Sequence, residues 1–265
     1  MPRNHAKVAT ILSIVSLGVS TLTLIVAVFG STQQIFGVDP PARSNKKAEA
    51  IRRFAASLAN SDISALASLD DVIAKDSLAD KYINSVYSIR AAVQRQTGTK
   101  FEGFDLVAGK NGWKVCTVGN SSDCSTYDEF RFDSEDMIID CHRDGHTLRE
   151  INVASDGQST EGDGVVAIPL AGRRLPGADS TEYAIRIRNT RDSAVSVSRC
   201  MIVENATGQT RFYDSFPSQK AESWQDLDVY CEFNTANVGT PQYLGLTVVY
   251  ADGEQVNLWS TFRFT

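Results

Sequence analysis

The apolar residues of the chain follow three patterns: one uncharged run, a segment of helical periodicity and a long series of alternating segments. The uncharged run is Val8–Phe29, 22 consecutive residues without an acidic or basic side chain. Because an α-helix rises about 1.5 Å per residue, this run can cross a hydrocarbon core of about 30 Å. We therefore expect residues 8–30 to form a transmembrane helix, or signal anchor, with residues 1–7 as a cytoplasmic tail.

The charges around this run favour a C-terminal body outside the cytoplasm. Arg3 and Lys7 precede it, whereas the residues directly after it, STQQIFGV, carry no charge. Positive residues stay on the cytoplasmic side of a membrane span. A cleaved signal peptide is the alternative, with the small residues Val28 and Gly30 before Ser31, although its apolar region usually has only about 7–15 residues. Both interpretations place the rest of the chain across the membrane.

Helical periodicity begins after a short proline-containing segment. Residues 31–45 include Pro40 and Pro41, which do not fit a helix interior, and they predict a stalk. Apolar residues then recur at spacings of three and four in three segments: Ile51–Leu58, Leu66–Ile73 and Leu78–Val93. Asp62 is a candidate N-cap for the second helix, and Gly98 follows the third helix, expected at 77–96.

The period then changes from about 3.6 to 2, which predicts antiparallel strands. Asn111 and Gly112 lie between two apolar runs and predict a hairpin turn, because both residues tolerate positive φ. YDEFRF and MIIDCH, joined by the acidic tip DSED, predict a second hairpin, and TLREINVA predicts a further strand. Helices followed by this meander predict an α+β domain over residues 46–153, with the helices on one face of a curved sheet.

The order and size of the elements in residues 46–153 resemble the cone-shaped domain of the nuclear transport factor two-like superfamily. In that superfamily the helices and sheet enclose a pocket, which some members use for catalysis and many use only for packing or association. The resemblance therefore implies a pocket between the helix at 77–96 and the meander.

The last part of the chain contains only strand patterns. Residues 154–164, ASDGQSTEGDG, are small, acidic and glycine-rich, and they predict a linker or long loop. Residues 165–265 then contain seven strand-like runs separated by turn residues; Ile185 and Ile187, for example, alternate with Arg186. Seven short strands in about 100 residues resemble an immunoglobulin-like or fibronectin-like β-sandwich. That architecture implies adhesion or presentation rather than a particular activity.

Only residues 141–146, CHRDGH, place cysteine, histidine and acid side by side. If 143–145 form a three-residue hairpin loop, His142 and His146 oppose each other on one face of the sheet. Two histidines alone do not complete a zinc site, which needs three or four ligands, and Cys141 points to the opposite face. We expect a tight turn, with His142 and His146 as the only candidate metal ligands.

The five cysteines follow the apolar run and contain no CxxC spacing, so zinc-ribbon and thioredoxin motifs are absent. Outside the cytoplasm we expect two disulfides and one leftover thiol. Cys200 and Cys231 lie on separate predicted strands and are placed to join the two sheets of the sandwich. Cys116 and Cys124 flank a short loop and form the second candidate pair, with Cys141 as an alternative partner for either.

No complete catalytic constellation is visible in the sequence. The GxSxG, GxGxxG and GxxxxGK motifs are absent, so we assign no catalytic residue and no cofactor. The net charge of −6 disfavours a nucleic-acid partner, since phosphate binding needs a basic surface.

The sequence favours a single-pass protein of the cell membrane, held in lipid through residues 8–30, that acts as a non-catalytic binding or scaffold module. Its partner is then a protein of the cell envelope. The alternative function is a ligand-binding or enzymatic α+β domain with its pocket between the helix at 77–96 and the meander. A buried, polar-lined cavity favours the alternative, and an apolar filled interior favours the scaffold. A component of a larger envelope complex is a third possibility.

Overall fold

The computed structural model describes residues 42–155, 159–175, 180–203, 210–213, 220–234 and 242–264. The expected tail at 1–7, the expected membrane helix at 8–30 and most of the expected stalk lie outside these ranges. Within them, every helix is too short or too polar to cross a bilayer. The end of the expected stalk is corrected, because helix α2 already begins at Ala42. A proline pair directly before a helix is compatible with this start, since proline fits the first helical turn.

The helices end where the sequence provides caps. The described helices are α2 (Ala42–Ala59), the 3₁₀ helix η1 (Ile63–Ser68), α3 (Leu78–Thr97) and α4 (Leu148–Ile151). Ser77 caps α3 by accepting from the backbone N–H of Asp80, and Gly98 ends it with a φ of 67°. Asp62 caps η1 through Ser64, so the predicted cap is correct, although the helix that follows is shorter than the pattern suggested.

The first sheet is an antiparallel meander in the order β1-β2-β3-β4-β5. Its strands are β1 (Phe104–Ala108), β2 (Gly112–Thr117), β3 (Cys124–Phe132), β4 (Ile138–Arg143) and β5 (His146–Thr147). The turn between β1 and β2 is shifted from its predicted position. Gly109 donates to the carbonyl of Gly112 at 2.8 Å, so Lys110 and Asn111 form the turn. Gly112 is needed for space instead, since a Cβ there would lie 2.0 Å from the carbonyl oxygen of Tyr127.

The expected strand TLREINVA is interrupted by a turn of helix. Thr147 and Glu150 form a capping box at the start of α4: the Thr147 N–H donates to the Glu150 carboxylate at 2.8 Å, and the Glu150 N–H donates to the Thr147 hydroxyl at 3.4 Å. Leu148 and Ile151, three residues apart, are both fully buried. The spacing T-x-x-E is therefore the local signal that outweighed the strand pattern.

The second sheet contains all seven strands predicted over residues 165–265. Its members are β6 (Asn152–Ser155), β7 (Thr160–Gly162), β8 (Val165–Leu175), β9 (Ser180–Asn189), β10 (Val195–Val203), β11 (Thr210–Tyr213), β12 (Lys220–Ala221), β13 (Asp226–Asn234), β14 (Gln242–Tyr250) and β15 (Gln255–Phe264). They form one hydrogen-bonded sheet in the order β11-β10-β14-β15-β6-β8-β9-β13, with β12 on β10 and β7 on β8.

The linker expected at 154–164 is corrected in part by this topology. Ala154 and Ser155 belong to β6, which pairs with both β15 and β8, and Thr160–Gly162 forms β7. A sandwich has two separate sheets. Here β6 pairs with β15 on one side and β8 on the other, so the strands form one continuous sheet. The core beneath contains buried residues from β8, β9, β10, β13, β14 and β15, so the two ends of the sheet face each other across it.

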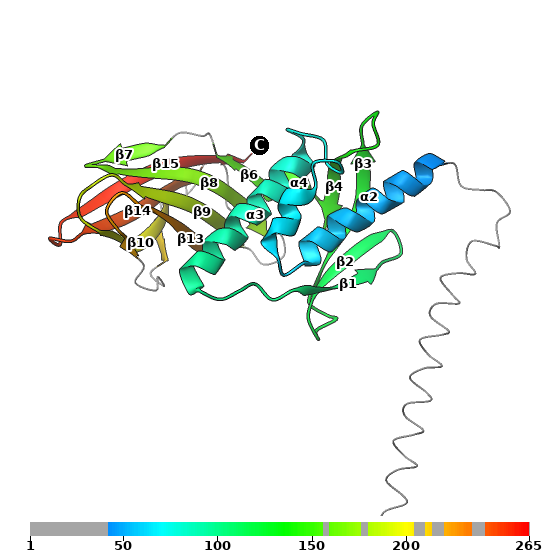
Figure 1. Ribbon diagram of the computed structural model, residues 1–265, viewed down its shortest axis with the longest axis horizontal. Helices are drawn as coiled ribbons and strands as arrows, with labels where there is room; N and C mark the ends of the chain where they lie inside the picture. Colours follow the sequence, from blue (N-terminus) through cyan, green and yellow to red (C-terminus); the bar gives the residue numbers. More distant parts are fainter. Residues whose placement is uncertain are drawn as a thin grey trace, which may run out of the picture. The chain divides into compact units, whose positions relative to one another are not determined.

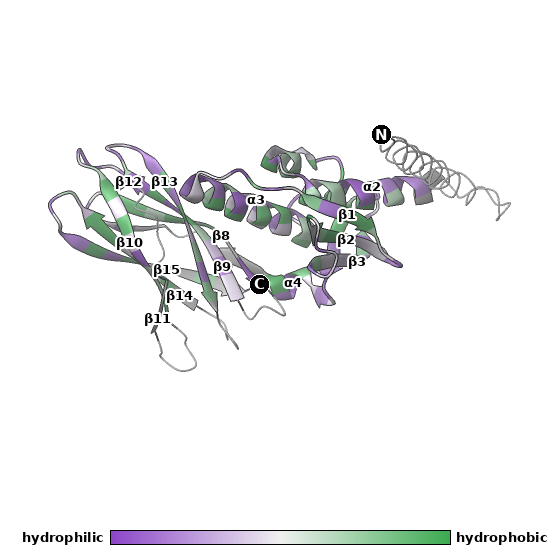
Figure 2. Cartoon of the chain, turned by 90° about the horizontal axis from the view of Figure 1, so that it is seen from below, coloured by the Kyte–Doolittle hydropathy of each residue, from purple (hydrophilic) through white to green (hydrophobic). Residues whose placement is uncertain are grey.

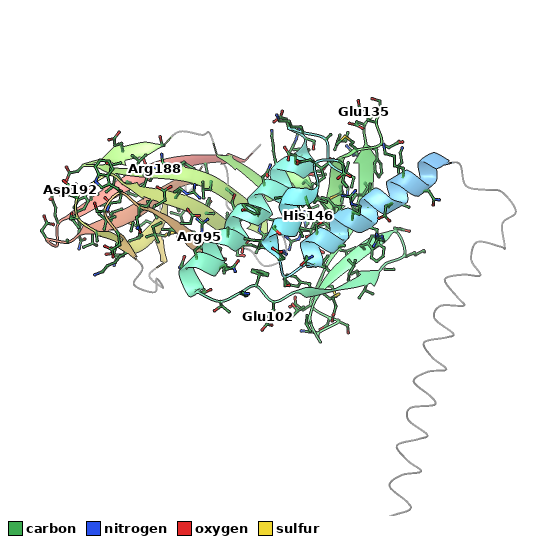
Figure 3. All side chains as sticks on the ribbon, viewed as in Figure 1. Arg95, Glu102, Glu135, His146, Arg188 and Asp192 are labelled. Carbon is green, nitrogen blue, oxygen red and sulfur yellow. A yellow bond between two sulfur atoms is a disulfide. The ribbon has the colours of Figure 1, made fainter. Side chains whose placement is uncertain are left out.

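Helix α3 contacts both sheets. It packs against β4 of the first sheet and against β8, β9 and β13 of the second (Figure 1). Hydrophilic and hydrophobic residues alternate around it, as Figure 2 shows. Arg95, labelled in Figure 3, pairs with the buried carboxylate of Asp228 on β13. The side chain of Gln96 accepts from the backbone N–H of Tyr230 at 2.8 Å, and residues 46–265 pack as one compact unit. The fold is thus mixed α+β with mostly antiparallel strands.

Two disulfides link the described strands. Cys116 on β2 is bonded to Cys124 on β3, and Cys200 on β10 is bonded to Cys231 on β13, while Cys141 is a buried free thiol. These are the two pairs favoured by the sequence, although Cys200–Cys231 joins two ends of one continuous sheet. Disulfides persist in oxidising compartments, so they are consistent with a secreted or otherwise extracytoplasmic location.

Candidate functional site

A cavity of about 280 Å³ opens between helix α3 and the first sheet. Its walls come from α2, α3, the first four strands and β8, and they contain three arginines. The lining residues are Leu58, Val86, Arg90, Phe101, Phe104, Val115, Thr117, Asp123, Ser125, Tyr127, Arg143 and Arg173. A cavity therefore lies where the resemblance implied a pocket, and its lining contains both polar and apolar residues.

Arg90 is a buried cation on the inner face of α3. It is 7% exposed, four residues after the buried Val86. Its guanidinium donates to the carbonyl of Leu58 at 2.7 Å and lies 4.7 Å from the ring centre of Phe101 and 5.4 Å from that of Phe104. Carbonyl dipoles and aromatic faces stabilise a cation without neutralising it. Among the described residues, no carboxylate forms an ion pair with Arg90.

The electrostatics of Arg90 follow from this arrangement. Burial, followed by the positive charge of Arg173, lowers the pKa of Arg90 to about 10, and Arg143 acts in the same direction. The side chain therefore stays charged at neutral pH but pays a desolvation penalty. A bound anion would remove part of that penalty.

Arg143 enters the pocket from the end of β4. Its guanidinium donates to the hydroxyl of Ser125 at 2.8 Å and to that of Tyr82 at 3.3 Å, and its Nε lies 3.3 Å from the carboxylate of Asp144. The Tyr82 hydroxyl in turn lies 2.8 Å from that of Tyr127, and both rings are buried. Burial raises the pKa of Tyr127, so the phenol stays neutral and can donate or accept.

Arg173 reaches the pocket from β8, so the second sheet contributes to a cavity otherwise built by residues 58–143. It forms an ion pair with Glu182 on the neighbouring strand β9. Glu182 also accepts from the Tyr230 hydroxyl at 2.9 Å. Burial acts to raise the pKa of Glu182, but the charge and hydrogen bond of Arg173 and the bond from Tyr230 outweigh it, and the pKa is lowered. The pair is therefore ionised, and it holds the Arg173 side chain against the pocket.

The mouth of the pocket is formed by exposed residues at the β2–β3 connection. The Thr117 hydroxyl donates to the carboxylate of Asp123 at 2.6 Å, and the Thr117 N–H donates to the Asp123 carbonyl at 2.9 Å. The disulfide between Cys116 and Cys124, adjacent to both residues, joins the two strands at this point. The carboxylate of Asp123 thus stands at the opening, opposite in charge to the interior.

A larger hollow of about 580 Å³ lies between η1 and α3, lined by Leu66, Ala67, Leu69, Asp70, Ile73, Lys75, Asp80, Ile83 and Asn84. Its central carboxylate, Asp80, already accepts from the Asp76 N–H at 2.9 Å and from the Asn84 amide at 3.0 Å. These bonds belong to the first turn of α3. The arginine pocket is the stronger candidate site, because it contains a buried charge that has no carboxylate partner among the described residues.

The histidine pair expected as a metal candidate does not come together. His142 pairs with Thr147 and Arg143 pairs with His146, so the turn contains only Asp144 and Gly145. Both turn residues have positive φ, 54° and 79°, which suits a two-residue hairpin. Because the register differs by one residue from a three-residue loop, His142 and His146 lie on opposite faces of the sheet.

The remaining candidates have structural roles. The carboxylate of Asp144 accepts from the Thr126 N–H at 2.7 Å and fastens the turn to β3. In the acidic tip DSED, the Asp133 carboxylate accepts from the N–H groups of Glu135 and Met137, both at 2.9 Å. Among the described residues, no group of three or more His, Cys, Asp or Glu side chains is arranged to hold a metal ion. Burial raises the pKa of the Cys141 thiol, which makes it unreactive.

Sequence reasoning missed the three arginines. Arg90 had a detectable signal, since it lies four residues after Val86 on the apolar stripe of the third helix, where a charge is unexpected. Arg143 was assigned to a loop, and Arg173 lies at the end of an apolar strand remote in sequence. Nothing local connects these three positions, because only the tertiary fold brings them together.

Comparisons with known proteins give no family for the chain. No family model matches it, and neither does any curated protein. A Northeast Structural Genomics Consortium target, solved by X-ray diffraction, is 16% identical with a TM-score of 0.25, over 44% of this chain and 86% of that one. A Bordetella pertussis protein described as ApaA is 12% identical with a TM-score of 0.28, over 40% and 92% respectively. Similarities this weak support neither superfamily suggested by the sequence, so the description stays at that of a β-rich α+β fold.

Proposed function

We propose that this chain is a membrane-anchored extracytoplasmic protein that binds a small anion in its arginine pocket, without catalysing a reaction. The observation that carries the proposal is the burial of Arg90 without a carboxylate partner among the described residues. Burying a charge is costly unless it is paired, and such groups are therefore retained mainly where a ligand or partner completes them. Arg143 and Arg173 lie in the same lining and add donors for an anion.

The location follows from the two disulfides together with the N-terminal sequence. Oxidised cysteines support an extracytoplasmic body. The uncharged run Val8–Phe29 is long enough to anchor that body in the bilayer, with residues 1–7 in the cytoplasm. The binding site would then face the outside of the cell membrane.

The pocket favours the ligand-binding alternative over the scaffold interpretation. A scaffold needs no cavity, and an interior filled by apolar side chains would have supported it. Arg90, Arg143 and Arg173 instead line a cavity of about 280 Å³. A protein partner in the cell envelope is compatible with this function, as it would respond to or deliver the ligand.

The test is calorimetric titration of the full-length chain, solubilised in detergent, with acetate, benzoate and inorganic phosphate. We expect at least one anion to bind, and Arg90→Gln to weaken it about tenfold or more, since a hydrogen bond to a charged group contributes about 1.5–3 kcal/mol. Arg52→Gln is the matched control, because Arg52 is exposed on α2, lies outside the pocket lining and forms its ion pair with Glu49. Absence of binding by all three anions would contradict the proposal.

A further inference from the structure

We infer that the pocket selects a small organic acid with one carboxylate and an apolar body, and that Asp123 excludes acids with a second negative charge. This inference rests on the proposed anion-binding function and specifies its ligand. The distribution of donors, apolar surface and negative charge over the pocket wall supports it.

The donors suit a carboxylate. Guanidinium groups present planar pairs of N–H bonds that match the two oxygens of a carboxylate. Arg90 donates to the carbonyls of Leu58 and Asn60. Arg143 donates to Ser125 and Tyr82, and its Nε also faces Asp144. These contacts leave N–H groups over on both side chains. Each guanidinium has five donors, so a carboxylate can bind without breaking these contacts.

Part of the remaining wall is apolar and suits a hydrocarbon body. This part contains the buried residues Leu58, Val86 and Val115, and the rings of Phe101 and Phe104 also line the cavity. Inorganic phosphate, with oxygens in all directions, would leave some of them against this surface without a donor, which is unfavourable. The volume of about 280 Å³ is at the lower end for ligand pockets and limits the body to roughly the size of one ring.

Asp123 limits the number of negative charges that a bound ligand can carry. Its carboxylate is fixed at the mouth by the Thr117 hydroxyl, and the Cys116–Cys124 disulfide holds the two strands there. A monocarboxylate bound to the arginines presents only its apolar end to Asp123. A dicarboxylate would place its second charge near Asp123, where like charges repel.

The experiment compares four probes on the full-length protein by calorimetry: benzoate, benzyl alcohol, terephthalate and inorganic phosphate. We expect benzoate to bind, and the uncharged benzyl alcohol and phosphate to bind at least about tenfold more weakly. Terephthalate adds a second carboxylate to the benzoate ring. It should bind about tenfold more weakly than benzoate, which corresponds to about 1.4 kcal/mol of repulsion from Asp123. Asp123→Asn can keep the hydrogen bond from Thr117. In this variant the ratio of the benzoate affinity to the terephthalate affinity should fall at least about threefold.

Asp252→Asn is the control, because it removes the same charge in the turn after β14, outside the pocket lining. Phosphate binding more tightly than benzoate would overturn the inference while leaving the proposed anion site intact. Equal affinities for benzoate and terephthalate, or an unchanged ratio in Asp123→Asn, would overturn the role of Asp123. Absence of binding by every anion would overturn both the inference and the proposed function.

Discussion

The hydroxyl of Tyr82 on α3 lies 2.8 Å from the hydroxyl of Tyr127 on β3, and this bond joins the helix to the sheet behind the arginine pocket. Both rings are buried, and the Tyr82 hydroxyl also accepts from Arg143. The helix, the sheet and one pocket arginine therefore share a single polar contact. It fixes the distance between the two walls of the cavity.

Removing one hydroxyl of this pair should cost more than the hydrogen bond alone. Tyr127→Phe removes the Tyr127 partner of the Tyr82 hydroxyl. Tyr82→Phe removes that bond from the buried Tyr127 hydroxyl and also takes one acceptor from Arg143, which keeps its contacts with Ser125. We expect each variant to lose about 1–3 kcal/mol of unfolding free energy. The double variant should lose less than the sum, because both unpaired groups are then gone. Chemical denaturation of the four proteins measures this, and strict additivity would exclude a coupled pair.

The two disulfides should differ in their effects on stability and on binding. The Cys116–Cys124 bond spans 8 residues and the Cys200–Cys231 bond spans 31. If loop entropy dominates, replacing Cys116 and Cys124 by serine should lower the unfolding free energy by about 2.5 kcal/mol. The same replacement of Cys200 and Cys231 should lower it by about 4 kcal/mol. Only loss of Cys116–Cys124 should weaken anion binding, because its loop contains the mouth residues Thr117 and Asp123. Unfolding curves and calorimetry separate the two effects, and weaker binding in both variants would argue against a local role.

The two-residue turn at Asp144 makes a prediction about side-chain choice. Asp144→Ala removes the acceptor of the Thr126 N–H and places a residue that resists positive φ at 54°. We expect a loss of about 2 kcal/mol, while Asp144→Asn should change stability little, since asparagine tolerates this conformation and keeps an acceptor oxygen. Similar losses in both variants, measured by urea denaturation, would mean that the carboxylate charge, not the turn, is what matters.

The pH dependence of stability should carry a contribution from Glu182. Its pKa in the folded state is lowered from 4.5, despite burial, by Arg173 and by the hydrogen bond from Tyr230. A depressed carboxyl pKa contributes stability that is present above about pH 4.5 and is lost as the pH falls through the folded value. The wild type should therefore lose stability below about pH 4.5 more steeply than Glu182→Gln. Parallel curves for the two proteins would show that the Arg173–Glu182 pair has no linkage to protonation.

Local signals in the sequence predicted much of this fold. The caps at Asp62 and Gly98 and the alternation at Ile185 and Ile187 depend on neighbouring residues, and such features can be predicted from one chain. The turns were less predictable, because Asn111-Gly112 and Asp144-Gly145 look alike, yet only the second pair forms the turn. Which residues take positive φ depends on the register of whole strands. The position of Gly112 is decided by its contact with Tyr127, which lies on another strand.

The candidate site was only partly predictable. The resemblance of residues 46–153 to a cone-shaped domain implied a pocket beside the third helix, and Arg90 interrupts an apolar stripe of that helix. The approach of Arg173 depends on β6, which carries the chain into the second sheet and which the sequence assigned partly to a linker. Contacts between residues so far apart in sequence arise from the packing of both sheets on α3.

The most direct test of the account is crystallographic location of a carboxylate in the pocket. Crystals of the protein soaked with 4-bromobenzoate should show anomalous bromine signal within the cavity, with the carboxylate bound by Arg90 and Arg143 and the bromine towards Asp123. Arg90→Gln crystals soaked in parallel should lack the signal. A cavity that contains only water in the soaked wild-type crystals, or bromine found solely on the outer surface, would contradict the proposal that the buried arginines form an anion site.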